Sequence, residues 1–147
     1  MAESPLDPGL QAWLAARTQA VLVTLRGDGS PQSSNVAYAW DDGVARVSVT
    51  NGRAKTANLR RDPRGMLHVL GADFWSYAAV AVRAELSPVT TEPGDETGRA
   101  LLAYYERAAG KAHPDPEDYF AAMVAERRLL LTLHALSATG WNAPAGQ

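Results

Sequence analysis

The densest group of chemically useful side chains is a basic segment, N-G-R-A-K-T-A-N-L-R-R-D-P, at residues 51–63. Its pattern predicts a short helix over Ala54–Arg61, which Asp62-Pro63 ends because a residue before proline avoids the helical region. Arg53 and Lys55 stand at the start of this helix, where the helix dipole normally favours acidic side chains. A bound anion would explain both cations, because free backbone N–H groups and side-chain cations can bind it together. The segment therefore predicts a phosphate site.

The last turn of the same helix carries a second pair of cations, Arg60 and Arg61. The helix dipole favours cations there, so this pair can be a solvated helix end. A further contact with the anion is the alternative, and the sequence leaves both explanations open. Gly52, directly before Arg53, would let the backbone approach a ligand closely.

Uncharged polar side chains alternate along two predicted strands that precede the basic helix. They are Gln32, Ser33, Asn35, Ser48 and Thr50. Amides and hydroxyls donate and accept without charge, which suits the edge of a polar heterocycle. Taken alone, such alternation is more often just the solvent-facing side of a strand. The pattern gains meaning from the basic helix beside it.

Trp75 and Tyr77 share one face of a later predicted strand by the period of two, and they suit stacking on a planar ligand. Core or dimer-interface aromatics are the alternative. The three histidines are scattered and the chain has no cysteine, so no metal site is expected. The sequence has no G-x-S-x-G elbow, Walker loop or G-x-G-x-x-G motif. If the protein is an enzyme, a cofactor must supply the reactivity.

The elements that must position these residues are short strands and a few helices. Strands are expected over Ala20–Arg26, Gln32–Trp40, Val44–Thr50, Gly65–Leu70, Trp75–Leu86 and Leu129–Leu136. Further helices are expected from Asp7-Pro8, over Glu96–Ala109 and from Asp115-Pro116. Six strands in short connections predict a mainly β (α+β) fold, a small antiparallel barrel with flanking helices.

Length and composition bound the possible functions. A chain of 147 residues predicts one domain, 1–147, with a real hydrophobic core. A net charge of −2 argues against a general attraction to nucleic acid. The absence of cysteine excludes disulfides and thiolate metal sites. No secretory signal and no apolar run of ~18 residues is visible, so we expect a cytoplasmic protein without membrane insertion.

Four motifs together point to a known family. They are D-G-S-P-Q-S-S-N-V at 28–36, R-A-K-T-A-N-L-R-R-D-P at 53–63, W-S-Y at 75–77 and E-R-R-L-L-L-T-L at 126–133. With the order of the elements, they resemble the split β-barrel proteins related to pyridoxamine 5′-phosphate oxidase. The similarity is greatest to the actinobacterial branch that uses the deazaflavin coenzyme F420. The resemblance covers nearly the whole chain and implies a six-stranded split barrel and a homodimer with two cofactor sites at the subunit interface.

The same resemblance assigns expected roles to the residues. It implies that Arg53 and Lys55 hold the coenzyme phosphate, with Arg60 near its anionic tail. The residues expected along the deazaflavin and its ribityl chain are Gln32, Asn35, Ser48 and Thr50. Trp75 is expected to help close the pocket. The remaining candidate cofactor contacts are Ser33, Ala54 and Tyr77. No catalytic acid or base is assigned, because the cofactor delivers the hydride in this family.

The chain departs from the true pyridoxamine phosphate oxidases. It is shorter, and its end, A-T-G-W-N-A-P-A-G-Q, lacks the arginine-bearing motif that grips pyridoxal phosphate there. The leading hypothesis is therefore a reductase that passes a hydride from reduced F420 to a conjugated, electron-poor organic substrate. Two alternatives stay open: an FMN-binding oxidoreductase of the same fold, and a non-catalytic protein that binds a flavin or haem.

Overall fold

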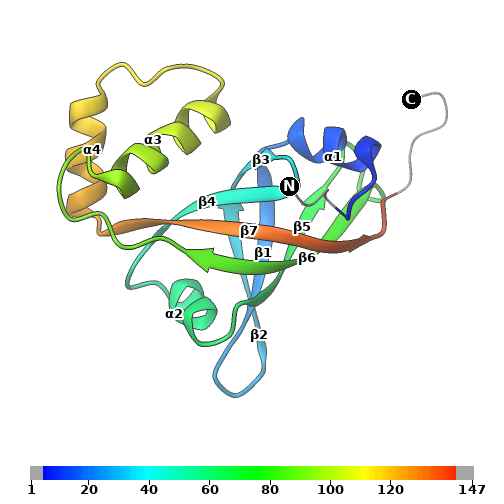
Figure 1. Ribbon diagram of the computed structural model, residues 1–147. Helices are drawn as coiled ribbons and strands as arrows, with labels where there is room; N and C mark the ends of the chain where they lie inside the picture. Colours follow the sequence, from blue (N-terminus) through cyan, green and yellow to red (C-terminus); the bar gives the residue numbers. More distant parts are fainter. Residues whose placement is uncertain (1–4, 142–147) are drawn as a thin grey trace.

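The computed structural model describes residues 5–141 (Figure 1). Residues 142–147, most of the C-terminal segment that argued against pyridoxal phosphate, lie outside the described residues. The elements are α1 (Pro8–Ala15), β1 (Gln19–Leu25), β2 (Pro31–Ala37), β3 (Ala39–Asp41), β4 (Val44–Thr50), α2 (Ala54–Arg61), β5 (Arg64–Leu70), β6 (Tyr77–Leu86), α3 (Glu96–Ala109), α4 (Pro116–Ala125) and β7 (Arg128–Thr139). The mainly β fold with flanking helices is confirmed. None of the described helices is long and apolar enough to cross a membrane.

All the strands belong to one antiparallel sheet in the order β2-β1-β5-β6-β7-β4-β3. Strands β2 and β3 lie at opposite edges of this order, although only Tyr38 separates them in the chain. The sheet must therefore curl until its two edges approach each other, which gives the predicted split barrel. The split runs between β2 and β4, which are not paired with each other.

The sheet has seven strands rather than the six expected, because the predicted run Gln32–Trp40 is divided at Tyr38. The Tyr38 N–H donates to the Thr18 carbonyl at 2.8 Å, and its hydroxyl donates to the Leu14 carbonyl at 2.7 Å. Its ring is fully buried, so burial, not alternation, decides the conformation at this point. From there the chain leaves β1 and joins β4.

The barrel core consists of the inward side chains of the strands. Its fully buried large members include Leu22, Val47, Leu67, Val69 and Leu131. Helix α1 covers one end of the barrel with Leu10 and Leu14 (Figure 1). Helix α2 lies toward the other end, directly before β5, and buries Leu59.

The turn between β5 and β6 corrects one expectation from the sequence. Strand β6 begins at Tyr77 and not at Trp75, because Asp73 organises residues 73–76 as a turn. Its carboxylate accepts from the N–H groups of Trp75 and Ser76 at 2.8 and 3.0 Å. Trp75 and Tyr77 therefore do not alternate along one strand.

A helical hairpin of α3 and α4 is inserted between β6 and β7 (Figure 1). It has a small core of its own in which Leu101 and Tyr119 pack against Leu130 of β7. Asp95 and Asp115 cap the two helices by accepting from backbone N–H groups. The packing on Leu130 fixes the hairpin to β7, which pairs with β4 at the split.

Candidate anion-binding site

A pocket of about 420 Å³ lies at the split, beside the N-terminus of α2. It is lined by Gln32 and Ser34 of β2, Ser48, Val49 and Thr50 of β4, Arg53, Ala54 and Lys55 at the start of α2, and Arg128 of β7. The basic segment and both predicted polar strands thus meet in one place, as the sequence indicated.

The end of β4 places the start of α2. The carbonyl of Thr50 accepts from the Arg53 N–H at 3.2 Å and from the Thr56 hydroxyl at 2.8 Å. Thr56 is fully buried, so this contact fixes the first turn of the helix against the strand. Arg53 is the N-cap residue, in an extended conformation without a side-chain cap. The first N–H groups of a helix have no partner within it, so α2 offers them to a ligand.

Three cations, Arg53, Lys55 and Arg128, surround this helix start. Burial lowers the pKa of the Lys55 ammonium, and the neighbouring charges of Arg53 and Arg128 lower it further. The first turn of α2 contains no acidic residue. An anion bound among these groups would relieve the mutual repulsion, which is the electrostatic signature expected of a phosphate site.

Arg128 is a site residue that the sequence did not assign. Its Nη1 lies 3.4 Å from the Ser48 hydroxyl, while its Nε and Nη2 donate to Glu126 at 3.1 and 3.0 Å. Strand pairing brings it here, because Arg128 of β7 lies opposite Thr50 of β4. Tertiary pairing brings it beside the basic segment, so the motif at 126–133 that contains Arg128 gave no local sign of this role.

Only one face of β2 lines the pocket. Gln32 and Ser34 are half-buried and line it, whereas Ser33 and Asn35 are exposed on the other face. Asn35 lines a separate hollow, of about 560 Å³, on the outer side of the sheet. The period of two, applied to Gln32, would have indicated Ser34 in place of Ser33.

Buried Asn58 of α2 orients Gln32. Its amide donates to the Thr24 hydroxyl and to the Gln32 carbonyl oxygen, both at 3.0 Å. The acceptor of Gln32 is therefore engaged, and its NH₂ group is left for the pocket. A ligand at this position would meet a hydrogen-bond donor.

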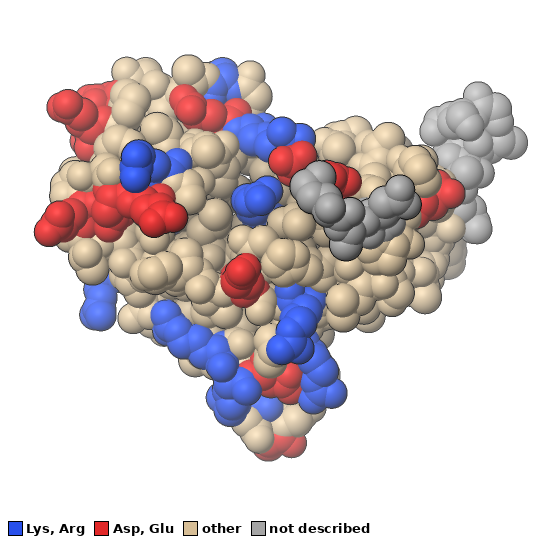
Figure 2. Space-filling view, viewed as in Figure 1, with Lys and Arg blue, Asp and Glu red and all other residues tan. Residues whose placement is uncertain are grey.

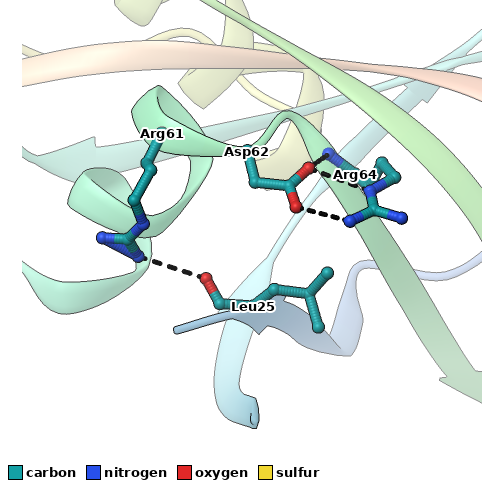
Figure 3. A network of polar contacts seen from close by, with 4 residues as sticks. All are labelled: Leu25, Arg61, Asp62 and Arg64. Carbon is teal, nitrogen blue, oxygen red and sulfur yellow. Dashed lines mark hydrogen bonds and ion pairs between the residues drawn. The ribbon is translucent and has the colours of Figure 1, made fainter. Parts of the chain in front are cut away.

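The two arginines at the end of α2 differ in their roles. Arg61 donates to the Asn58 side chain at 2.7 Å and to the Leu25 carbonyl at 3.3 Å, so it fastens α2 to β1 (Figure 3). Arg60 is exposed and does not line the pocket. Figure 2 shows that basic side chains gather at the lower end of the molecule, where Figure 1 has α2 and the β1–β2 turn.

The aromatic candidates lie at the opposite end of β5. Trp75 is 81% exposed, and Tyr77 stacks on His68 with ring centroids 5.2 Å apart. Strand β5 starts just after α2 and ends at Leu70, just before this turn, so about 20 Å of strand separates the two ends. Within one chain, these aromatic side chains do not meet the anion pocket.

The outer side of the sheet exposes an apolar surface that includes this turn. Its exposed large side chains are Met66, Leu70, Phe74, Trp75 and Tyr77. Register places Met66 beside Val23 of β1 and Ala81 of β6, so the surface continues across three strands. Contiguous exposed apolar surface of this kind marks an interaction site. Among residues 5–141, no group of three or more metal-ligating side chains occurs.

Comparison with known proteins places these features in context. The family model described as pyridoxamine 5′-phosphate oxidase matches residues 6–138. A solved structure described as an F420 reductase is 23% identical, with a TM-score of 0.70, over 92% of this chain and 99% of that chain. A conserved hypothetical protein from Mycobacterium tuberculosis is 21% identical, with a TM-score of 0.72, over 98% of this chain and 89% of that chain. An FMN-binding protein from Nostoc punctiforme is 14% identical, with a TM-score of 0.65, over 94% of this chain and 84% of that chain. These structures share the fold.

Proposed function

The chain belongs to the pyridoxamine 5′-phosphate oxidase family, and we propose that it is a reductase that uses the reduced deazaflavin coenzyme F420. The observation that carries this proposal is the gathering of Arg53, Lys55 and Arg128 around the free N-terminus of α2. Such a site suits the phosphate of a cofactor. The likeness to a structure described as an F420 reductase, over 99% of that chain, favours F420 over FMN.

In this proposal, the protein binds and orients the cofactor. Arg53, Lys55 and Arg128 hold the phosphate, with the N–H group of Ala54 beside them. Gln32, Ser34, Ser48 and Thr50 contact the polar chain and the ring edge. Bound reduced F420 supplies a hydride to a conjugated, electron-poor organic molecule, so no acid–base pair of the protein is needed for the hydride step.

We also propose a homodimer in which the outer apolar surfaces of two copies pack together. A two-fold arrangement would bring the β5–β6 turn of one copy toward the α2 end of the other. Trp75 and Tyr77 would then serve the partner's pocket, and exposed Ser33 and Asn35 would face the interface. Arg60, exposed in the last turn of α2, would meet an anionic extension of the cofactor.

Fluorescence titration with F420 tests the proposal. We expect micromolar or tighter binding, weakened at least 100-fold by Arg53→Ala combined with Lys55→Ala, since each charge-assisted contact contributes about 1.5–3 kcal/mol. Arg99→Ala, an exposed arginine of α3, is the matched control and should bind as the unchanged protein does. No binding of F420 at micromolar protein would rule the proposal out.

An FMN-dependent oxidoreductase is the second candidate, supported by the likeness to the FMN-binding protein from Nostoc punctiforme. One phosphate fits the same three cations. Purified protein that retains stoichiometric FMN, visible in its absorption spectrum, would favour this candidate. Binding of either cofactor without turnover of any acceptor would instead favour a non-catalytic carrier.

A further inference from the structure

One edge of β4 is only partly covered by its neighbour. Strand β3 pairs with β4 over Val44–Arg46 and leaves Ser48 open on that side. On the other side, Ser48 lies opposite Leu130 of β7. The N–H of Leu130 donates to the Ser87 hydroxyl at 2.8 Å, and its carbonyl accepts from the Ser87 N–H at 3.0 Å, so both groups point away from β4. The Ser48–Leu130 pair is therefore a non-hydrogen-bonded pair, and the backbone N–H of Ser48 points into the split.

Tyr104 of α3 reaches this open edge. Its hydroxyl donates to the carbonyl of Ala37, the last residue of β2, at 3.0 Å. Burial raises the pKa of this hydroxyl, while a backbone hydrogen bond from Ser48 and the charge of Arg128 lower it. The hydroxyl thus donates to β2 and lies against the backbone of β4 at Ser48, whose N–H points into the split, so it contacts both strands that border the split.

Other contacts hold α3 in place independently of this hydroxyl. Leu101 is fully buried, and its carbonyl accepts from the Tyr119 hydroxyl at 2.9 Å. Arg107 donates to the Trp40 carbonyl at 3.1 Å. Removing the Tyr104 hydroxyl should therefore leave the helix docked and affect only the bridge.

We propose that Tyr104 is a positioning residue that sets the width of the anion-binding split by joining β2 at Ala37 to β4 at Ser48. Ser34 and Ser48 line the pocket from its two sides, and the bridge lies just beyond Ser34 along β2. Without the bridge, the two edges can separate and the polar groups of the pocket lose their spacing. That the ligand of this pocket is a cofactor rests on the proposed function, whereas the contacts of Tyr104 with β2 and β4 do not depend on it.

Tyr104→Phe tests this role, with Tyr105→Phe as its matched control. Tyr105 is the next residue of α3, and its ring packs against His113 and Tyr119 at 4.9 and 5.4 Å. We expect Tyr104→Phe to raise the dissociation constant of F420 or FMN about 5- to 10-fold, the loss of one hydrogen bond, with a melting temperature within about 3 °C of the original. Tyr105→Phe should change affinity less than about 2-fold. Unchanged affinity in Tyr104→Phe would overturn the proposal.

Amide hydrogen exchange separates this result from a failure of the proposed function. If the unchanged protein binds neither cofactor, the proposed function fails, and the exchange of the Ser48 amide still tests the bridge. We expect this amide to exchange at least about 10-fold faster in Tyr104→Phe than in Tyr105→Phe, while the amide of core residue Leu67 is unaffected. Equal Ser48 exchange in both variants would contradict the bridge. A parallel change at Leu67 would contradict it as well, because the hydroxyl would then act on the stability of the whole fold and not on the split.

Discussion

The backbone N–H of Asn51 donates to the carbonyl oxygen of Arg127 at 2.9 Å, which ties the turn before α2 to the turn before β7. Both turns lead into a cation of the anion pocket, since Arg53 closely follows Asn51 and Arg128 follows Arg127. Arg127 has a φ of 54°, in the left-handed region that residues other than glycine rarely adopt. The position of Arg128 thus depends on an uncommon backbone conformation.

Substitution of Arg127 should reveal this conformation. Arg127→Gly should be at least as stable as the unchanged protein, because glycine adopts positive φ freely. Arg127→Val should be about 1–2 kcal/mol less stable than Arg127→Gly, since a β-branched residue is strained there. Urea unfolding measures both. Ala121→Gly, within α4, is the control and should cost about 1 kcal/mol; a similar loss in Arg127→Gly would contradict the expectation.

Asn58 should contribute more to the free energy of unfolding than an exposed asparagine does. It is 5% exposed and bonds with Thr24, Gln32 and Arg61. Asn58→Ala leaves these groups without their partner, so the free energy of unfolding should fall by about 2–3 kcal/mol. Asn51→Ala, whose side chain makes no hydrogen bond within residues 5–141, should change it by less than about 0.5 kcal/mol. Equal effects of the two substitutions in chemical denaturation would contradict the assigned role.

Anion affinity should depend on pH through Lys55. Its pKa in the free protein is lowered from the ordinary value of 10.5, and a bound anion stabilises the charged form. When the pH approaches the lowered pKa, anion binding is therefore coupled to the uptake of a proton by Lys55. The affinity for the anion then falls as the pH rises through this pKa, which lies below 10.5. Inorganic phosphate titrated calorimetrically between about pH 8 and 10.5 would measure this. Lys55→Arg should remove the dependence, because arginine stays protonated; an unchanged pH profile in that variant would exclude Lys55 as its source.

The exposed pair Phe74 and Trp75 should act on assembly and not on the fold of one chain. Their side chains are 75% and 81% exposed and contact each other edge to face at 4.8 Å. Replacing both by alanine should shift a dimer toward the monomer, because this pair is a large part of the exposed apolar surface. Sedimentation velocity over a range of concentrations measures the shift. Phe120→Ala, on the separate core of α3 and α4, should leave the association constant unchanged.

The elements with strong local signals were predicted well. Helices α2 and α3 have the predicted bounds, because Asp62-Pro63 and the Asp95 and Gly110 caps are local features. The interruption at Tyr38 was missed because it depends on bonds with Thr18 and Leu14, which only the closed barrel brings near. In the same way, Arg128 enters the pocket through pairing with β4, a relationship between distant parts of the chain. The turn at Asp73 overrode the strand preference of the residues around Trp75.

The place of β7 in the sheet has a consequence for how the protein forms. Strand β7 lies between β6 and β4, so it alone pairs the β3–β4 hairpin with the rest of the sheet, although it is the last described strand to be synthesised. Until β7 is available, β1, β2, β5 and β6 can assemble, while the β3–β4 hairpin has no further strand to pair with. Closure must therefore follow translation of this strand, and pairings between such distant segments form slowly. The anion pocket, which needs β4 and Arg128 together, is completed last.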